Sequence, residues 1–300
     1  MAARNWFSII GVLMNFGSEE QRRRFFPEIA AGHTLSAAAI TEPEAGSDPA
    51  SMKTRAVKDG DSYVLNGHKA WVSWGTLSKY VTIFAKTGDV ERRGIDNISC
   101  FIVPADTPGL EFATPERKLG MRGAPSGQMY LDNVRVPAEN LIGEEGKGFL
   151  AAMRILDLSR PTVGAMAVGI AQGATDVALD FARERQQFGR AISDFQAVQF
   201  MLADMQMHTD AARLVVYDCA ARIDAGNLEG IAAKSSMSKA FPTDVAMKVT
   251  TDAVQILGSA GCSKDYPVER MFRDAKVNQI WEGTNQIQRV VIAREMLKKR

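Results

Sequence analysis

The sequence predicts an α+β protein built from a short helical segment, an antiparallel β-barrel and a C-terminal helix bundle. Helical signals fill the first 32 residues, including a capping box at Ser18-Glu19-Glu20-Gln21. From residue 34 to 137 apolar residues alternate with the period of strands, and beyond Gly143 the helical period continues to the end. We therefore expect a helical segment at 1–33, a β-barrel domain at 34–143 and a helix bundle at 144–300.

Composition and charge exclude several classes of function. The 300 residues carry a net charge of +1 with acids and bases interspersed, so the chain lacks the basic surface that nucleic-acid binding needs. The cysteines are far apart and the histidines scattered, which predicts neither a disulfide framework nor a metal site. No segment is apolar for long enough to span a bilayer. We expect a soluble protein of a reducing compartment, the cytoplasm or, in a eukaryote, the mitochondrial matrix.

The sheet region contains several candidate strands and two strong turn signals. Asp59-Gly60 and Asn66-Gly67 are typical of two-residue β-hairpin turns. They predict an antiparallel meander around residues 54–73 and, with the remaining strands, a small barrel or sandwich. The candidate strands are 35–41, 54–58, 62–66, 69–73, 80–86, 98–103 and 129–136.

The helical region predicts a bundle of closely packed helices. Small residues are frequent from 163 to 174, which favours close packing, while Pro161 and Pro242 predict local interruptions. Between residues 195 and 224, apolar or small positions alternate steps of four and three, the spacing of a bundle seam. The seam positions are Val198, Leu202, Met205, Thr209, Ala212, Val216, Cys219 and Ile223.

One carboxylate, Glu282, is placed immediately before a helix. Gly283 permits a tight backbone, Thr284 is a suitable N-cap, and apolar residues at helical spacing follow. The unpaired N–H groups of a helix start favour the ionised form of a nearby carboxylate, which suits a general base. Glutamate is also common at helix starts that have no catalytic role, so this stretch alone leaves both interpretations open.

Two stretches of the sheet region could contact a ligand. The loop 41–48 combines hydroxyl residues, a glycine and acidic residues, which could face a polar ligand or form a simple surface turn. Trp71 and Ser73 are expected on the same side of a strand. A flat ring beside a hydroxyl suits an aromatic ligand, although a strand tryptophan is often a core residue.

Three stretches of the helical region also have two interpretations each. The run 185–189 places a cation and Gly189 where a helix would end. Asp157 and Arg160 could form an ion pair at a helix break, and 255–261 could be a helix end followed by a glycine loop. None of these stretches decides a function by itself.

Together, these blocks closely resemble the acyl-CoA dehydrogenase family, flavoenzymes that introduce an α,β double bond into acyl thioesters. The loop 41–48 is similar to one family motif, and 255–261 followed by Trp281-Glu282-Gly283-Thr284 is similar to the other. Asn66-Gly67-His68-Lys69-Ala70-Trp71 and 185–189 match as well, so the resemblance covers essentially the whole chain. It implies FAD, an acyl-CoA substrate, an electron-transferring flavoprotein as electron acceptor, a role in fatty-acid β-oxidation, and a homotetramer (a dimer of dimers).

The resemblance also implies roles for individual residues. Glu282 falls on the family's catalytic carboxylate; some members carry the base at the position of Ser159, and serine there leaves Glu282 without a competitor. Ser47, Asp157, Arg160 and Gly283 would contact the substrate. The residues that would contact FAD, several of them in a neighbouring subunit, are Ile40, Thr41, Gly46, Ser47, Trp71, Ser73, Arg185, Gln187, Phe188, Gln196, Gln255, Gly258, Ser259, Thr284 and Gln286.

The implied chemistry fits these residue types. Removal of the α-proton of a thioester needs a base within hydrogen-bonding reach and a dry pocket that raises its basicity. The resemblance implies that the Glu282 N–H and a flavin ribityl hydroxyl polarise the thioester oxygen, while hydride passes from the β-carbon to the flavin.

Some features depart from the family pattern and leave alternatives open. Family members carry more helices ahead of the point that matches Met1, so residues 1–33 would be a remnant of the N-terminal helical domain. Trp281 replaces a common tyrosine and Trp74 a common asparagine, which leaves the acyl chain length undecided. The alternatives are an acyl-CoA oxidase or flavin monooxygenase on the same scaffold, or a non-catalytic subunit that binds CoA or flavin.

Overall fold

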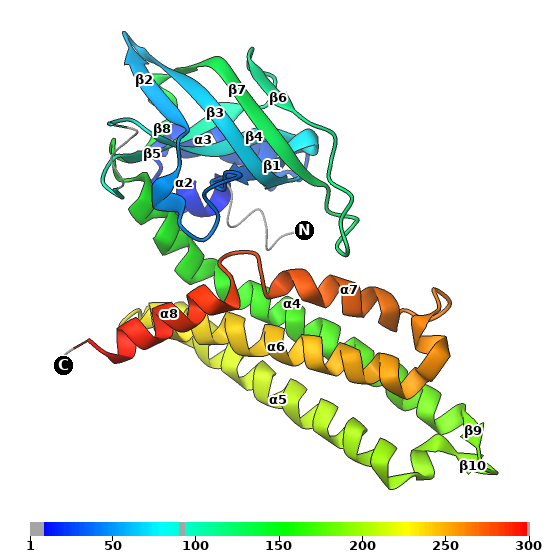
Figure 1. The fold of residues 1–300 in the computed structure, drawn as a ribbon. Helices are drawn as coiled ribbons and strands as arrows, with labels where there is room; N and C mark the ends of the chain where they lie inside the picture. Colours follow the sequence, from blue (N-terminus) through cyan, green and yellow to red (C-terminus); the bar gives the residue numbers. More distant parts are fainter. Residues whose placement is uncertain (1–8, 90–93, 299–300) are drawn as a thin grey trace. The chain divides into compact units, whose positions relative to one another are not determined.

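The fold is described from a computed structural model that covers residues 9–89 and 94–298 (Figure 1). It forms two compact units. The first contains the described residues up to Lys118 together with Arg122–Leu156, and the second contains Leu119–Met121 together with the described residues from Asp157 onward. Helix α4 (Gly148–Glu184) begins in the first unit and continues in the second. The three-part division expected from the sequence stays a prediction.

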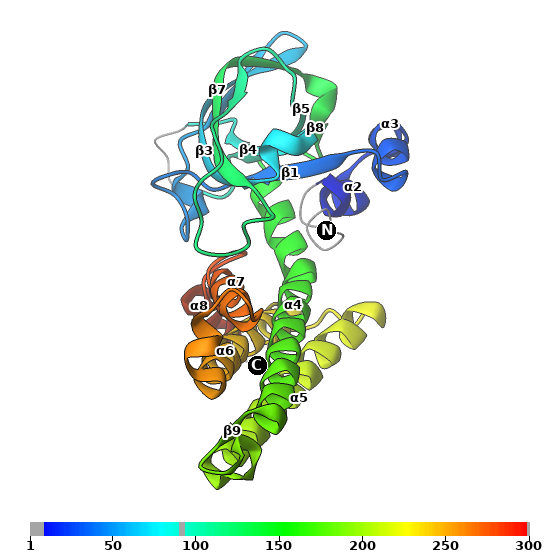
Figure 2. The same cartoon turned by 90° about the vertical axis from the view of Figure 1, so that its right-hand side faces the viewer.

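A curved β-sheet forms most of the first unit (Figures 1 and 2). Its strands are β1 (Leu35–Ala39), β2 (Arg55–Asp59), β3 (Ser62–Ser73), β4 (Ser78–Lys86), β5 (Ile98–Pro104), β6 (Leu110–Phe112), β7 (Ser126–Pro137) and β8 (Leu141–Ile142). Their order is β6-β7-β3-β2-β4-β5-β8, and β1 runs parallel to β4. The ladders are antiparallel except for that of β1 and one parallel pair, Arg55 with Lys86, between β2 and β4.

Strands β4 and β5 are buried on both faces, which explains their continuous apolar sequences. Val81 and Ile83 of β4 point into one core, shared with β1, β3 and β7, whereas Phe84 points into the other. The second core is closed by α2 (Gly11–Phe16), α3 (Glu19–Ala30) and the first turns of α4. Because side chains alternate along a strand, one run of apolar residues supplies both cores.

The edges of the sheet differ from the sequence expectation. The predicted barrel is not closed: β6 and β8 end the sheet, and no ladder joins them within residues 9–89 and 94–298. These edge strands are only three and two residues long, and the sequence did not predict either of them. In addition, β2 and β4 are joined by a single residue pair, so the sheet is weakly connected at this point as well.

One of the two predicted hairpin turns is confirmed and the other is wrong. Asp59 pairs with Ser62 across the turn at Gly60, as expected. Asn66-Gly67 lies inside the continuous strand β3, at an irregularity in its pairing with β7. A Cβ on Gly67 would collide with the Thr54 side chain. The glycine is therefore explained by a long-range contact that local turn statistics do not detect.

The N-terminal helices confirm the capping box. The Ser18 hydroxyl accepts a hydrogen bond from the Gln21 N–H at 3.1 Å, and the Gln21 side chain accepts one from the Ser18 N–H at 3.0 Å. Helix α3 continues through Pro27 to Ala30. The Gln21 amide also donates to the carbonyls of Glu139 and Leu141, which ties α3 to the end of the sheet.

The second unit is a helix bundle (Figure 2). After α4 and a small hairpin, β9 (Gln186–Gln187) with β10 (Arg190–Ala191), come α5 (Gln196–Asp224), α6 (Ile231–Leu257), α7 (Val268–Asn278) and α8 (Asn285–Met296). Alanines of α4 form much of the core against α5 and α6. The predicted α5 seam is confirmed at its central positions, which are Met205, Thr209, Ala212, Val216 and Cys219.

Neither Pro161 nor Pro242 interrupts its helix, contrary to the sequence expectation. Pro242 lacks an N–H, so the Ser238 carbonyl loses its usual helical partner. Gly164 of α4 packs directly against that carbonyl, where a Cβ would collide with it. A proline on α6 and a glycine on α4 thus form one close helix contact.

Gly164→Ala is expected to destabilise the protein by about 1–3 kcal/mol, because the added methyl forces α4 away from the Ser238 carbonyl. Gly169→Ala on the same helix is the matched control, since a Cβ added there would meet no neighbouring element within 4 Å. It should be neutral or stabilising by up to about 1 kcal/mol. Chemical denaturation measures both, and equal stabilities for the two variants would contradict this account.

Helix α4 also corrects the expectation that no segment could span a bilayer. By length and composition alone it is apolar enough to cross a membrane. Its alanine face packs in the bundle core, and a buried core helix of a soluble protein meets the same criterion.

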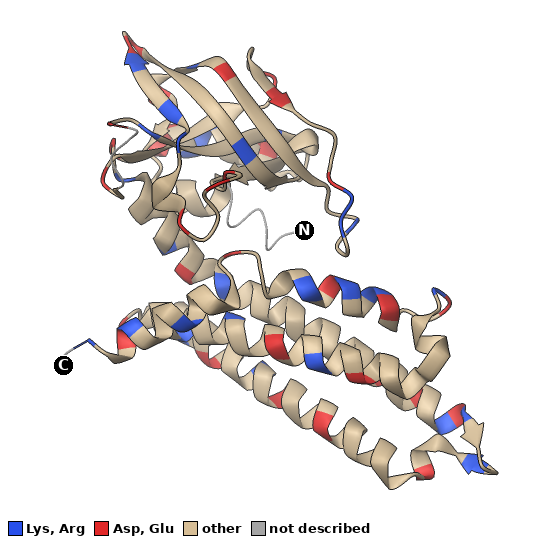
Figure 3. Ribbon diagram, in the orientation of Figure 1, with Lys and Arg blue, Asp and Glu red and all other residues tan. Residues whose placement is uncertain are grey.

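Acidic and basic residues are interspersed along the helices, for example on α7 (Figure 3).

Candidate active site

The Glu282 turn joins α7 to α8 and has an unusual backbone. Glu282 has a φ of 52° and Gly283 a φ of 92°, both in the left-handed region. This region is uncommon for a residue with a side chain and is found most often at functional sites. The Asn285 N–H donates to the Gln279 carbonyl at 2.9 Å and closes the turn. Thr284 caps α8 as predicted, accepting a hydrogen bond from the Ile287 N–H.

Donors from three helices hold the two carbonyls of this turn. Arg160 of α4 donates from Nε to the Glu282 carbonyl at 3.3 Å, and Lys239 of α6 donates from Nζ to the Gly283 carbonyl at 2.9 Å. Gln288 of α8 donates to both carbonyls, at 3.2 and 2.9 Å. The left-handed conformation is therefore stabilised by the surrounding bundle, as strained backbone requires.

The Glu282 carboxylate accepts a hydrogen bond from the buried Ser159 hydroxyl, at 2.8 Å from Oε2. The neighbouring Arg160 is also buried and forms an ion pair with Asp157, with Nη1 and Oδ1 3.1 Å apart. Burial lowers the pKa of Arg160, and the charges of Asp157 and Glu282 oppose this effect. The structure thus brings the predicted residues Asp157, Arg160, Glu282 and Gly283 together.

Lys239 is fully buried beneath the turn, and sequence reasoning did not single it out. Its Nζ also donates to Asn285 Oδ1 at 2.8 Å. Burial lowers the pKa of Lys239 to about 7. The negative charge of Glu282 raises this pKa, the positive charge of Arg160 lowers it, and the negative charge of Asp244 raises it. A lysine among serines and alanines on the buried face of a helix is the sequence signal that could have revealed it.

A second cluster contains Asp244 on α6, which anchors both ends of the turn. Gln279 and Asn285 donate to its Oδ1 at 2.6 and 2.7 Å, and Arg289 donates to Oδ2 at 2.7 Å. Burial alone would raise the pKa of Asp244, but these hydrogen bonds lower it. The turn is therefore fixed at its carbonyls and at its flanking side chains.

Another part of the second unit contains an open pocket of about 340 Å³. It brings together three predicted ligand residues, Gln187, Phe188 and Gln255, with an apolar lining that includes Phe195. The run 185–189 is not a simple helix end: α4 ends at Glu184, and a hairpin turns at Phe188 and Gly189, both with positive φ.

The other predicted residues of the second unit lie near helix ends. The expected helix end is confirmed, since α6 ends at Leu257 and Gly258 follows with a φ of 62°, but the expected glycine loop is a 3-10 helix, Gly258–Cys262. Ser259 lies in the next turn, and Arg185 and Gln196 flank the hairpin. Gln286 is exposed in the first turn of α8.

In the first unit, a buried ion pair holds the loop 41–48 (the hydroxyl loop). Glu42 accepts hydrogen bonds from the N–H groups of Lys53 and Thr54 and from Lys69 Nζ, which is 2.9 Å away. Lys69 is 0% exposed and Glu42 8%. Burial would raise the pKa of Glu42, but the charge of Lys69 and the hydrogen bonds lower it.

This ion pair positions the predicted ligand residues of the loop. Lys69 Nζ also donates to the Ile40 carbonyl at 3.2 Å, and the Ala70 N–H donates to the Thr41 carbonyl at 2.9 Å. Gly46 and Ser47, further along the loop, are exposed. The sequence did not predict this pair, because the two partners are 27 residues apart.

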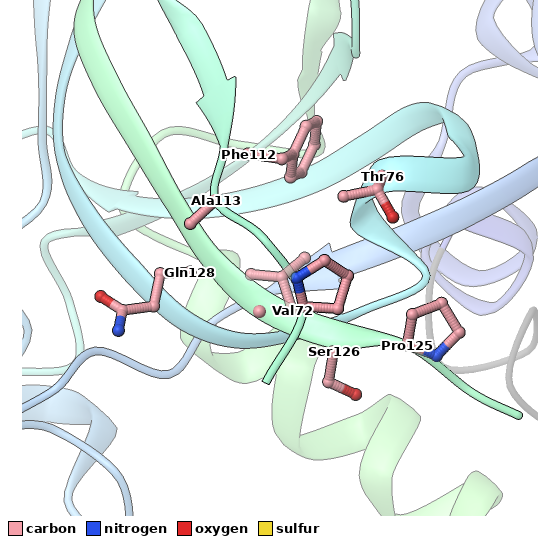
Figure 4. A pocket seen from close by; sticks show the side chains of 9 residues that line it. Val72, Thr76, Phe112, Ala113, Pro125, Ser126 and Gln128 are labelled. Atoms are coloured by element: carbon pink, nitrogen blue, oxygen red, sulfur yellow. The ribbon is translucent and has the colours of Figure 1, made fainter. Parts of the chain in front are cut away.

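Trp71 is 61% exposed on β3 and has a φ of 59°. The pairing with β7 shifts between Lys69 and Val72. Side chains therefore do not alternate regularly between the two faces of the strand here, and that alternation was the reason to expect Trp71 and Ser73 on the same side. Ser73 Oγ is 2.8 Å from Ser126 Oγ. Ser126 in turn lines a small pocket with Val72, among others (Figure 4).

Comparison with known proteins identifies the family. Models of the acyl-CoA dehydrogenase middle domain and C-terminal domain match residues 37–134 and 146–297. This chain belongs to the acyl-CoA dehydrogenase family. A probable acyl-CoA dehydrogenase of Mycobacterium tuberculosis is 50% identical over 296 residues, which cover 99% of this chain and 75% of the relative.

Two further relatives support this assignment. Cyclohexane-1-carbonyl-CoA dehydrogenase of Geobacter metallireducens is 48% identical, over 96% of this chain and 74% of its own length. The structure of butyryl-CoA dehydrogenase from Megasphaera elsdenii superposes with a TM-score of 0.94 at 38% identity, covering 99% of this chain and 76% of that one. The protein is thus an oxidoreductase of the acyl-CoA dehydrogenase type.

Backbone conformation gives an independent indication of the site in this acyl-CoA dehydrogenase. Among the described residues other than glycine, six have positive φ: Trp71, Trp74, Met121, Asn133, Phe188 and Glu282. Three of them, Trp71, Phe188 and Glu282, are residues that the sequence resemblance places at the cofactor or at the base. Because such conformations are costly and concentrate at functional sites, the overlap supports these assignments.

Proposed function

We propose that this acyl-CoA dehydrogenase performs the FAD-dependent α,β-dehydrogenation of an acyl-CoA thioester, with Glu282 as the general base. The observation that carries the proposal is the Glu282 turn, whose left-handed backbone is held by Arg160, Lys239 and Gln288. A base acts on a carbon acid only if it is fixed within hydrogen-bonding reach of the proton. The rigid turn supplies that precision.

The residues of this chain divide the work in the following way. Glu282 takes the α-proton on its carboxylate, which the Ser159 hydroxyl orients through the 2.8 Å hydrogen bond. Arg160, paired with Asp157, holds the backbone beneath the base. We assign to the Glu282 N–H the polarisation of the thioester oxygen, since a fixed backbone donor stabilises the charge that develops there.

The observed residues fit FAD. The 340 Å³ pocket places the exposed amides of Gln187 and Gln255 beside aromatic rings, which suits a flat, polar nucleotide group. The exposed ring of Trp71 suits a second flat group. The hydroxyl loop and the Ser73–Ser126 pair offer hydroxyl groups. FAD would supply the acceptor for the hydride that leaves the β-carbon, and we propose an electron-transferring flavoprotein as the next acceptor.

Anaerobic titration with acyl-CoA tests this function. The purified protein should be yellow, and a matching acyl-CoA should bleach its visible absorbance within one turnover. The panel should contain straight-chain thioesters of increasing length and cyclohexane-1-carbonyl-CoA, because one relative is named for that substrate. A colourless protein that takes up no FAD, or one that no thioester bleaches, would contradict the proposal.

Reoxidation identifies the electron acceptor. After bleaching, an added electron-transferring flavoprotein should restore the colour much faster than air does. Rapid reoxidation by air would instead favour an oxidase or monooxygenase on this scaffold.

We also propose a homotetramer, supported by the outer face of α5. Phe200, Met207, Leu214 and Tyr217 follow a heptad spacing and are all exposed in the single chain. An exposed apolar seam of this kind is typical of a surface that another subunit covers.

Leu214→Glu is expected to shift the protein from a tetramer to smaller species in light scattering, because a charge in the seam opposes its burial. Val57→Glu, at an exposed position on β2, is the control and should leave the mass unchanged. A Leu214→Glu protein that stays tetrameric would place the interface elsewhere.

A further inference from the structure

The Glu282 turn contains a cation that its hydrogen bonding alone does not explain. Gln288 already donates to both the Glu282 and Gly283 carbonyls without carrying a charge. Lys239 adds an ammonium group to the Gly283 carbonyl at 2.9 Å and to Asn285 Oδ1 at 2.8 Å, with no exposed surface. Burying an ammonium group has an unfavourable desolvation free energy, which a neutral side chain of similar shape would not have.

The charges around Lys239 indicate what the cation does. Arg160 and Asp157 of α4 form an ion pair with each other, and Asp244 of α6 is paired with Arg289 of α8. Among the charges near Lys239, that of Glu282 has the largest effect: it raises the pKa of the lysine against the effect of burial. The positive charge of Arg160 lowers this pKa, and Asp244 raises it to a smaller extent. The carboxylate of the turn is therefore the main negative charge that acts on the Lys239 ammonium group.

We propose that Lys239 is a positioning residue that fixes the turn through the Gly283 carbonyl and stabilises the ionised carboxylate of Glu282 by its charge. This inference rests on the proposed role of Glu282 as the base. Lys239 does not touch the substrate in this account; it sets the geometry of the base and the pH at which the base is ready to accept a proton.

Matched variants separate charge from hydrogen bonding. Lys239→Met removes the charge with similar volume. Gln288→Met removes neutral hydrogen bonds to the Glu282 and Gly283 carbonyls, and Lys248→Met removes an exposed lysine of α6 that pairs with Asp252. In Lys239→Met, the acid limb of kcat against pH should move up by about one pH unit, because a neighbouring positive charge no longer favours the carboxylate. The other two variants should keep the wild-type midpoint.

If Lys239→Met does not fold, Lys239→Gln keeps a donor but no charge, and the same upward shift is expected. The pattern of kinetic constants gives a further check: kcat should fall by more than KM rises, since the lysine acts on the base and not on substrate binding. An unchanged acid limb in the folded Lys239 variant would overturn the proposal.

A second readout does not depend on flavin or turnover. A double-mutant cycle of thermal unfolding compares the loss of stability caused by Lys239→Met in the wild type and in the Glu282→Gln background. At pH 6 this loss should be smaller in the Glu282→Gln background. The difference between the two backgrounds should shrink at pH 9.5, because the lysine has lost its proton there. Additive effects at both pH values would refute the charge coupling. If Glu282→Gln leaves bleaching intact, the proposed function fails. If bleaching depends on Glu282 but the stability effects of the two substitutions are additive, only the role of Lys239 is contradicted.

Discussion

Glu282→Gln is expected to slow anaerobic bleaching by acyl-CoA by about 10²–10⁴-fold, the usual contribution of a positioned general base. Glutamine keeps the size of the side chain and can still accept the Ser159 hydrogen bond, but it is not basic enough to remove the α-proton. The three donors to the Glu282 and Gly283 carbonyls are unaffected, so the fold and the binding of acyl-CoA should persist. Stopped-flow absorbance measures the rate.

The control is Glu295→Gln, a carboxylate of the same α8 region that pairs with Lys298. Its bleaching rate should equal that of the wild type. If Glu282→Gln bleaches within a few-fold of the wild-type rate, another group must act as the base.

Lys69→Met is expected to lower the free energy of unfolding by about 3–5 kcal/mol, because it leaves the buried Glu42 carboxylate without its cation. The hydroxyl loop should loosen as well, since Lys69 also holds the Ile40 carbonyl. FAD affinity, measured by fluorescence titration, should therefore fall along with stability. Chemical denaturation of the protein measures the free energy.

Lys53→Met is the matched control for this variant. Lys53 also pairs with a glutamate, Glu44, but both side chains are exposed, so the expected change is within about 0.5 kcal/mol. Similar losses in the two variants would show that burial of the Lys69–Glu42 pair contributes nothing.

The same lysine predicts a dependence of stability on pH. Burial lowers the pKa of Lys69 from 10.5 to about 8, although Glu42 opposes this. Between these two pH values, the unfolded chain binds a proton that the folded chain has released. The free energy of unfolding of the wild type should therefore rise with pH in this window relative to Lys69→Met. Unfolding at pH 7, 9 and 11 measures the effect.

Short-range features of this protein were predictable from the sequence. The Ser18 capping box, the turn after Asp59 and the Thr284 cap depend on residues within a few positions of each other, and all three are confirmed. The α5 seam follows from helical periodicity and is confirmed as well. The Glu282 position was found because it combines a local helix start with the family resemblance.

The features that sequence reasoning missed depend on distant partners. Asn66-Gly67 is a strong turn signal, but it lies inside β3, which pairs with β7 on both sides of it, and the glycine leaves room for the Thr54 side chain. Pro242 stays within α6, where Gly164 of another helix packs on the carbonyl that it leaves without its helical partner. Lys239 is distinguished in the sequence only as a lysine among serines and alanines, and only the folded bundle places it beneath the Glu282 turn.

The attachment of the Glu282 turn to α4, α6 and α8 links activity to the integrity of the bundle. The turn has no regular secondary structure of its own, so it adopts its shape only when all three helices are in place. Local fraying of α8, the last helix of the described chain, would release Gln288 and Asn285 before the remaining bundle unfolds. Mild heating or clipping near the C-terminus should therefore inactivate the enzyme while most of its helical signal remains, which makes turnover a more sensitive reporter of local unfolding than circular dichroism.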